Sequence, residues 1–327
     1  MSIAILEKIS QNTLGSPLLT PFISLADKTW FKTGGTARYY AEPKNPQEFQ
    51  EVLLSALSHD LPIGIIGDGA NMLISDEGFD GLIIRPRLTS IKRYELDSTS
   101  VHVEAHAGVL FSDLIVWCLE NNILGLEEFS GIPGTVGGSV FINIHYFEFL
   151  LSQFIRSAHV IEKKTGILKV VDNDWFQFGY NTSRLHDGTH YLISATFKLR
   201  KASAEESAHA LGRSQEIIRH RAQRYPLSHT CGSFFRNFTT QEVDRTSKKL
   251  IYVAYYLDKL GIKGELSVGG AIVSYKHANM IVNNGTATSL DIINLARTMQ
   301  EMVKNQFDIT PQPECRFVGF KEYPLLS

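Results

Sequence analysis

Residues 126–143 read LEEFSGIPGTVGGSVFIN, and the centre of this stretch, residues 131–138, holds four glycines and one proline. A backbone with so little side chain lets amide groups approach the phosphates of a ligand closely. The spacing fits neither the G-x-G-x-x-G of a Rossmann turn nor the Gly-Lys-Ser/Thr ending of a P-loop. Taken alone, the stretch favours a tight loop with positive φ angles. A second loop of the same kind shifts the interpretation towards a dinucleotide site.

That second loop lies in residues 63–74, IGIIGDGANMLI, where an apolar strand leads into Gly-Asp-Gly and then into another apolar stretch. Gly67, Gly69 and Asn71 would let consecutive backbone amides point at an anion without a lysine. A pyrophosphate suits such a loop. As an isolated pattern it is more typical of a hairpin turn, because glycine and asparagine dominate turns for conformational reasons.

Four segments resemble, in order and spacing, the signature segments of the UDP-N-acetylenolpyruvoylglucosamine reductase (MurB) family of flavoenzymes, in its shorter subtype. They are GDGANMLISDEGFDGLIIR (67–85), SGIPGTVGG (130–138), CGSFFRN (231–237) and PECRFVG (313–319). The resemblance runs from about Phe22 to Phe320. It implies an α+β protein with the FAD-binding PCMH/vanillyl-alcohol-oxidase-like fold of two subdomains, followed by a C-terminal α/β substrate domain.

Composition agrees with a cytoplasmic enzyme without selecting one. A formal charge of −2 over 327 residues argues against a nucleic-acid binder. The apolar runs are too short to cross a membrane, and the N-terminal MSIAILEKIS lacks a signal-peptide layout. Three cysteines fit neither a disulfide framework nor a metal site. We therefore expect a reduced, metal-free, cytoplasmic protein that binds neither membranes nor nucleic acids. We also expect a monomer, although composition does not bear on the oligomeric state.

Local patterns predict individual elements. Asn45 to Glu48 form a capping box with proline at the first helical position, Ser112 caps a second helix, and Ser289 precedes a third. Strands are expected at residues 63–66, 82–85, 100–107 and 158–162. The charged stretch after Lys201 indicates an exposed linking helix and a domain boundary. We predict three domains: residues 1–85 with the strand 308–320, residues 86–200, and residues 201–307.

The resemblance also implies the reaction: NADPH reduces FAD, and the flavin reduces UDP-N-acetylglucosamine enolpyruvate to UDP-N-acetylmuramate for peptidoglycan synthesis. Hydride addition to C3 of the enol ether leaves negative charge at C2 and its carboxylate, so the site needs a stabilising group and a proton donor. Ser233 matches the proton donor of the family and Glu314 its catalytic acid. Asn237 matches a substrate-binding amide, and Arg224 lies in the stretch that helps to hold the UDP diphosphate.

The residues that the resemblance assigns to FAD lie mainly in the two glycine loops. They are Gly67, Asp68, Gly69, Ala70, Asn71, Met72 and Leu73 from the first loop, Ile132, Pro133, Gly134, Thr135, Gly137 and Gly138 from the second, and Asn143 and Arg316 elsewhere.

Both catalytic segments are expected to be extended. Period-two alternation would place Ser233, Phe235 and Asn237 on one face of a strand. In residues 313–319 it would place Glu314 with Arg316, so that the arginine either pairs with the glutamate or touches the flavin phosphates. Without the resemblance, a half-buried strand and a solvent-exposed Glu/Arg face would be the preferred interpretations.

Three departures from the family pattern bear on activity. The Tyr-Arg-x-Ser motif, whose arginine binds the enolpyruvyl carboxylate in the family, is Tyr180-Asn181-Thr182-Ser183 here. Asparagine cannot form the guanidinium fork, and Arg184 is the nearest candidate replacement; it would need a turn, because in an extended chain it faces away from Asn181. The bulky residues 144–149 replace a small-residue stretch, and residues 251–260 predict a longer, aromatic helix.

These departures keep two alternatives open. The chain could be a related flavoprotein that acts on another substrate, or a noncatalytic protein that binds flavin or a UDP-sugar.

Overall fold

The computed structural model describes residues 16–244 and 246–326, and these form two compact units. Of the described residues, unit 1 comprises 16–22, 38–68 and 81–220, and unit 2 comprises 23–37, 69–80, 221–244 and 246–326. The boundary falls inside three strands and one helix, so the chain passes between the units several times. The N-terminal segment in which we sought a signal peptide lies outside the described residues.

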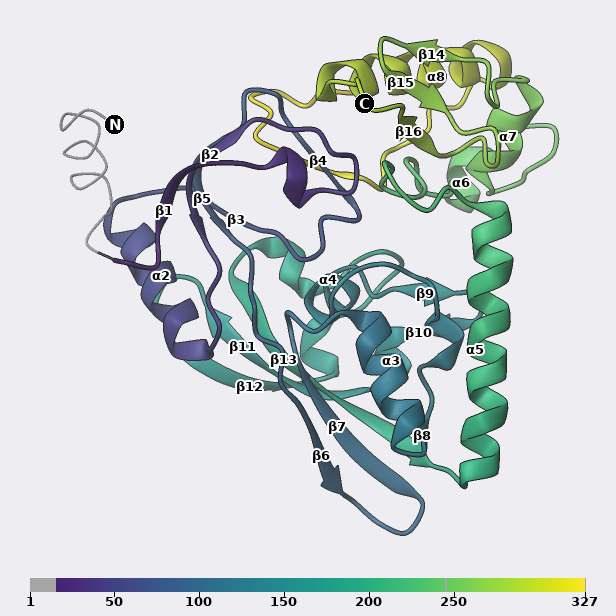
Figure 1. The fold of residues 1–327 in the computed structure, drawn as a ribbon. Coiled ribbons are helices and arrows are strands. Elements are labelled where there is room, and N and C mark those ends of the chain that lie inside the picture. Colours follow the sequence, from purple (N-terminus) through teal and green to yellow (C-terminus); the bar gives the residue numbers. More distant parts are fainter. Residues whose placement is uncertain (1–15, 245, 327) are drawn as a thin grey trace. The chain divides into compact units, whose positions relative to one another are not determined.

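Unit 1 is built on a six-stranded antiparallel sheet in the order β12-β11-β13-β7-β6, with β8 pairing beside β13 (Figure 1). In β7, Val101, Val103 and Ala105 alternate with more exposed residues and enter a core that α3 also lines. The strands and helices of this part are β6 (Ile91–Glu95), β7 (Ser100–His106), α3 (Phe111–Glu120), β8 (Ile123–Leu124), α4 (Val136–Phe141), β9 (His145–Tyr146), β10 (Phe149–Leu150), β11 (Ile155–Glu162), β12 (Leu168–Asp172) and β13 (His190–Lys201).

A smaller sheet of four strands has the order β1-β2-β5-β3, and its β3 and β5 run parallel. Helix α2 buries Phe49, Val52 and Leu53 in the core cluster that Leu82 and Ile84 of β5 also enter. The elements are β1 (Thr20–Ser24), β2 (Thr36–Ala41), α2 (Pro46–Ser58), β3 (Ile63–Ile65) and β5 (Phe79–Ile84).

Unit 2 has its own core around the long helix α8 (Ser289–Phe307), with a three-stranded sheet β14-β15-β16 and a parallel pair of β4 with β17. Helix α5, the long green helix of Figure 1, crosses from unit 1 to unit 2 between residues 220 and 221. The elements are β4 (Met72–Ile74), α5 (Ala204–Arg224), α6 (Thr240–Val243), α7 (Val253–Lys259), β14 (Ser267–Val268), β15 (Ala271–Val273), β16 (Ile281–Asn283) and β17 (Arg316–Val318).

Most of the predicted elements are confirmed, and one cap is wrong. Asn45 accepts the N–H of Glu48 at 2.9 Å, as the capping box requires. Ser112, by contrast, lies inside α3 and is exposed, while Leu110 occupies the cap position. The helix starts earlier because Phe111 is buried in the core and donates its N–H to the carbonyl of Gly134 at 2.9 Å.

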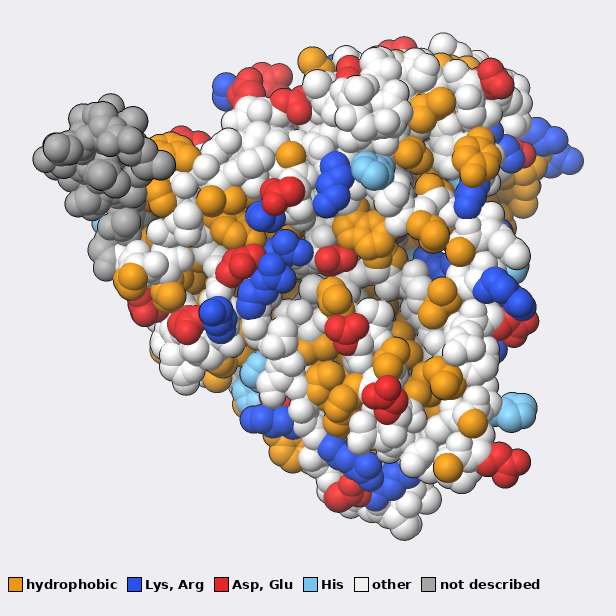
Figure 2. All heavy atoms as spheres, viewed as in Figure 1, with side chains coloured by type: hydrophobic (Ala, Val, Ile, Leu, Met, Phe, Trp, Pro, Cys, Tyr) orange, Lys and Arg blue, Asp and Glu red, His pale blue; other side chains and the backbone are white. Residues whose placement is uncertain are grey.

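The compact units divide the chain differently from the three expected domains. Residues 23–37 and 69–80 belong with the C-terminal part, and the boundary falls within α5 rather than at Lys201. The division into three domains stays a prediction. None of the helices in residues 16–244 and 246–326 combines the length and apolar character needed to span a bilayer. Acidic and basic side chains are interspersed over the face drawn in Figure 2.

The start of α8 provides a test of how unit 2 is held together. Asp76 accepts the N–H groups of Ser289 at 2.8 Å and Leu290 at 2.9 Å, so its carboxylate satisfies two otherwise unpaired donors at the positive end of the helix. We expect Asp76→Ala to lower the free energy of unfolding by about 1–2 kcal/mol, measured by urea denaturation.

The neighbouring Glu77 is the matched control. Its ion pair with Lys321 joins two side chains that are 68% and 83% exposed, so Glu77→Ala should leave the free energy of unfolding nearly unchanged. Equal effects of the two substitutions would contradict the assigned role of Asp76.

Candidate active site

The two glycine-rich loops predicted from the sequence meet within unit 1. A Cβ atom added to Gly67 would lie 2.6 Å from Oγ1 of Thr135, so only glycine allows this approach without a shift. Thr135 is the N-cap of α4, and its Oγ1 accepts the N–H of Gly138 at 3.3 Å. The loops therefore lie side by side, as a shared ligand would require.

The backbone amides of the second loop divide into two groups. The N–H groups of Val136 and Gly137 donate to the carbonyls of Val109 at 2.8 Å and Ala107 at 2.9 Å, which ties the start of α4 to its own unit. Within the described part of the chain, the N–H groups of Gly134 and Thr135 donate to no residue. These two amides are the donors that the loop keeps available for an anion.

The first loop continues into unit 2 with the same character. Gly69 has φ +71°, and a Cβ there would lie 2.3 Å from the carbonyl oxygen of Lys28. No residue in the described ranges accepts the N–H groups of Gly69, Ala70 or Asn71. Oδ1 of Asn71 is also buried without a partner there. Buried polar atoms are nearly always satisfied, so this cluster of donors and acceptors is suited to a polar ligand.

Arg85 was missed by the sequence analysis and lies beside the first loop. Its Nε donates to the carbonyl of Gly67 at 3.1 Å, and a terminal nitrogen lies 3.7 Å from Oδ1 of Asp68. The predicted cofactor residue Asp68 is thus paired with a half-buried cation. The only sequence signal was the arginine that ends the apolar strand GLIIR.

The predicted strand at residues 230–237 is wrong. Gly232 has φ +79°, and Phe234 and Phe235 are both buried instead of alternating. Within the described ranges, the one ladder contact of this segment is a bridge between Phe235 and Pro313. Asn279 takes the place of a neighbouring strand, because its side chain accepts the N–H of Phe235 at 3.0 Å and donates to the carbonyl of the same residue at 2.8 Å. Asn279 therefore has a structural role in this segment.

The two predicted catalytic residues come from segments joined by backbone hydrogen bonds in unit 2. The carbonyl of Phe234, directly after Ser233, accepts the N–H of Glu314 at 2.8 Å and that of Cys315 at 3.3 Å. Arg316 donates its N–H to the carbonyl of Asn71 at 3.1 Å, and Asn71 Nδ2 donates to the carbonyl of Glu314 at 3.3 Å. The structure therefore connects Ser233, Glu314 and the unit 2 end of the first glycine loop.

The neighbouring thiols of Cys231 and Cys315 are structural. Cys231 and Cys315 are buried in the core of unit 2, and burial together with the hydrogen bond from Cys315 raises the pKa of the Cys231 thiol well above its ordinary value. A thiol held neutral is a poor nucleophile.

Beyond Ser233, the chain is fixed by polar side chains. Arg236 forms two hydrogen bonds of 2.9 and 2.8 Å with the carboxylate of Glu242, which lower the pKa of Glu242 to about 2. Oδ1 of the predicted substrate residue Asn237 accepts the N–H of Val253 at 3.3 Å, at the start of α7. This helix, Val253–Lys259, is shorter than the predicted range 251–260.

The C-terminal end of α5 carries a basic, aromatic cluster in unit 2. The guanidinium groups of Arg221 and the predicted substrate residue Arg224 lie 5.1 and 5.7 Å from the ring centre of Tyr225. Lys276 donates to the carbonyl of Ala222 at 2.7 Å and so binds this end of the helix. Burial, with the charge of Arg224, lowers the pKa of the adjacent His277 to about 4.

Residues 180–183 of unit 1, which depart from the family motif, form a turn of the kind that Arg184 would need in order to replace the motif arginine. Gly179 donates its N–H to the carbonyl of Thr182 at 3.0 Å, which places Tyr180 and Asn181 at the tip, with Asn181 at φ +53°. Arg184 is nevertheless engaged elsewhere. Its guanidinium lies 4.9 Å from the ring centre of Trp175 and 3.8 Å from the carboxylate of Asp187.

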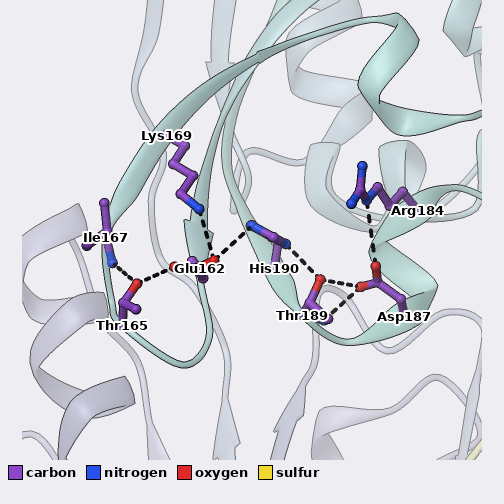
Figure 3. A network of polar contacts seen from close by, with 8 residues as sticks. All are labelled: Glu162, Thr165, Ile167, Lys169, Arg184, Asp187, Thr189 and His190. Carbon is purple, nitrogen blue, oxygen red and sulfur yellow. Dashed lines mark hydrogen bonds and ion pairs between the residues drawn. The ribbon is translucent and has the colours of Figure 1, made fainter.

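Figure 3 shows that the Arg184–Asp187 pair belongs to a longer chain of polar contacts. Asp187 accepts the N–H and the hydroxyl of Thr189, both at 2.7 Å, and the hydroxyl lies 2.7 Å from Nδ1 of His190. These contacts hold Asp187 in place, and Asp187 in turn orients Arg184. Replacement of the motif arginine by Arg184 stays a prediction.

The segment after Asn143 also has a definite structure. The buried Asn143 amide donates to the carbonyl of Gly179 at 3.1 Å and accepts the N–H of Ser152 at 2.9 Å. Residues 145–150 form the β9–β10 hairpin, with Phe147 at its tip. Asn143, predicted to bind the cofactor, thus supports the Tyr180-Asn181 turn through its side chain.

Two side-chain-poor loops with unpaired amides, within an α+β fold, define a dinucleotide-binding protein, and comparison with known proteins specifies the class. A sequence model described as "FAD binding domain" matches residues 37–171, and one described as "UDP-N-acetylenolpyruvoylglucosamine reductase, C-terminal domain" matches residues 223–318. The protein is therefore an FAD-binding flavoprotein.

Relatives named UDP-N-acetylenolpyruvoylglucosamine reductase extend over nearly the whole chain. That of Lactobacillus delbrueckii subsp. bulgaricus is 35% identical over 298 residues, which are 91% of this chain and 94% of the relative. That of Acaryochloris marina is 33% identical over 306 residues, 93% of this chain and 94% of the relative. The crystal structure of the reductase (MurB) from Thermus caldophilus superposes with a TM-score of 0.72 at 26% identity, covering 90% of this chain and 97% of that one.

The chain belongs to the UDP-N-acetylenolpyruvoylglucosamine reductase (MurB) family. The family resemblance, and the α+β flavin fold that it implies, are confirmed.

Gly69 offers a test of the cofactor loop. Gly69→Ala would force a side chain against the backbone of residue 28, so we expect purified protein to carry much less FAD, measured by its flavin absorbance. Gly188→Ala is the matched control, because Gly188 has φ +69° but a Cβ there meets nothing within 4 Å. Equal FAD content in both variants would contradict the role of the loop.

Proposed function

We propose that the chain reduces UDP-N-acetylglucosamine enolpyruvate to UDP-N-acetylmuramate, with FAD as cofactor and NADPH as reductant, in the synthesis of peptidoglycan precursors. The observation that carries this proposal is the backbone pairing of the Ser233 and Glu314 segments within unit 2, in a chain of this family. We further propose that it acts in the cytoplasm as a monomer.

The residues present fit FAD. The amides of Gly134 and Thr135 in unit 1, and those of Gly69, Ala70 and Asn71 in unit 2, are donors of the kind that bind phosphates. Arg85 adds a positive charge beside Gly67 and Asp68. When bound, FAD supplies the hydride that the substrate receives at C3.

Ser233 supplies the proton that completes the reduction. Hydride addition at C3 leaves an enolate across C2 and the carboxylate, and the Ser233 hydroxyl donates its proton to C2 as the new C–H bond forms. A serine hydroxyl is a weak acid, so it donates only to a strongly basic carbon and needs help from neighbouring groups.

Glu314 stabilises the charge that develops on the substrate. Its backbone is fixed by the carbonyl of Phe234 and by Asn71, so the carboxyl group starts from a defined position. In this role it acts as a hydrogen-bond donor to the enolate, because an ionised carboxylate would oppose the developing negative charge.

The family resemblance assigns substrate binding to a few further residues. Arg224, within the cluster around Tyr225, supplies positive charge for the diphosphate, and the amide of Asn237 supplies a hydrogen-bond donor. Tyr180 and Asn181 hold the enolpyruvyl carboxylate. Arg316 is assigned to the flavin phosphates and Asn143 to support of the Tyr180-Asn181 turn.

Ser233→Ala tests the chemistry. We expect NADPH to reduce the flavin of this variant at the wild-type rate, whereas reoxidation by the enolpyruvyl substrate slows by about 10²–10⁴-fold, because only the second step needs the proton. Anaerobic stopped-flow absorbance measures both steps. Ser228→Ala, at an exposed serine nearby, should leave both rates unchanged.

The same experiment separates the alternatives. Wild-type flavin that NADPH reduces but the enolpyruvyl substrate does not reoxidise would favour a related flavoenzyme with another substrate. Tight ligand binding without NADPH consumption, and no effect of Ser233→Ala, would favour a noncatalytic binding protein.

A further inference from the structure

His145 lies beside the turn that lacks the motif arginine. Its ring centre is 4.9 Å from that of Tyr180, the residue preceding Asn181, and the two rings are tilted by 47°. Among the described residues, no side chain or backbone group hydrogen-bonds the imidazole nitrogens. A histidine with both nitrogens available and one face against a tyrosine is placed to bind a ligand.

The fold holds His145 and the turn in a fixed relation. His145 lies two residues after Asn143 and pairs with Leu150 in the β9–β10 hairpin. The Asn143 side chain links the start of this hairpin to the Tyr180-Asn181 turn, because it donates to the carbonyl of Gly179 at the base of the turn. Through this hydrogen bond and the ring contact, the hairpin and the turn support each other within unit 1.

Asn181 provides a second, independent indication that a ligand binds here, because its side-chain amide lacks a hydrogen-bond acceptor. Its Nδ2 is buried, and no acceptor for it exists among the described residues. The left-handed backbone at φ +53° fixes the direction in which the side chain leaves the turn. A buried amide donor without an acceptor is uncommon in a folded protein and indicates an acceptor that arrives with a ligand.

We propose that His145 and Asn181 together bind the carboxylate of the substrate, so that imidazole and amide replace the guanidinium of the usual motif. This inference rests on the proposed function, from which the carboxylate follows. His145 becomes a substrate-binding residue that no sequence motif indicated.

The electrostatics of the pair suit this role. Burial lowers the pKa of His145, so the imidazole is neutral before the substrate arrives. A carboxylate placed against it favours the protonated form, so binding of the anion promotes a positive charge on the imidazole. Together, the imidazole of His145 and the amide of Asn181 offer two hydrogen-bond donors, the number with which a guanidinium grips a carboxylate.

The test compares three substitutions of His145 by their effect on reoxidation of NADPH-reduced flavin by the enolpyruvyl substrate. His145→Phe keeps a ring against Tyr180 but removes both nitrogens, His145→Gln keeps one donor, and His145→Ala removes ring and donors. We expect His145→Phe and His145→Ala to raise the substrate concentration for half-maximal rate at least about tenfold, and His145→Gln to raise it less.

Rescue provides the decisive measurement. Restoring the motif arginine with Asn181→Arg in the His145→Ala background should recover at least part of the lost substrate affinity, because a guanidinium can replace both donors. Wild-type affinity in His145→Phe, or no recovery in the double variant, would overturn the proposal. The unfolding temperature and the rate of flavin reduction by NADPH are the controls. A merely structural defect would change one of these two quantities in all three variants.

Failure of this inference differs from failure of the proposed function. If the wild-type flavin is never reoxidised by the enolpyruvyl substrate, the proposed function is wrong. If the wild type is active and His145→Phe is equally active, only the role of His145 is wrong.

Discussion

The carbonyl group of Phe234 is the point on which the proposed chemistry depends. It accepts the N–H groups of Glu314 and Cys315, and it lies one residue after Ser233. Because a backbone hydrogen bond fixes direction as well as distance, it sets the relation between two residues that are 81 positions apart in the sequence. Asn279 strengthens the same junction by pairing with both backbone groups of Phe235.

The sequence predicts best what local chemistry decides. The Asn45 cap of α2 and the amphipathic helix α8 depend on residues only a few positions apart, and the structure has both. The two glycine loops were recognisable for a similar reason, since close backbone approach excludes side chains. Their meeting at Gly67 and Thr135 could be expected only from the family resemblance and not from either loop alone.

The predictions of local structure fail where a residue far away in the sequence supplies the hydrogen-bond partner. Alternation in residues 231–237 failed because the Asn279 side chain, rather than a neighbouring strand, satisfies the backbone of Phe235. Ser112 had the right chemistry for a cap, but the hydrogen bond from Phe111 to Gly134 begins the helix earlier. In the sequence, Arg85 is marked only as the arginine that ends an apolar strand, and His145 carries no local signal. The relevance of both follows from the loop and the ring that the fold places beside them.

The most direct test of the account is a double-mutant cycle on Ser233 and Glu314, with the rate of flavin reoxidation by the enolpyruvyl substrate as the measurement. If the two residues act on one transition state, the variant carrying both Ser233→Ala and Glu314→Gln should be about as slow as the slower single variant. Losses that multiply in the double variant would show that the two side chains act independently, and would contradict the account.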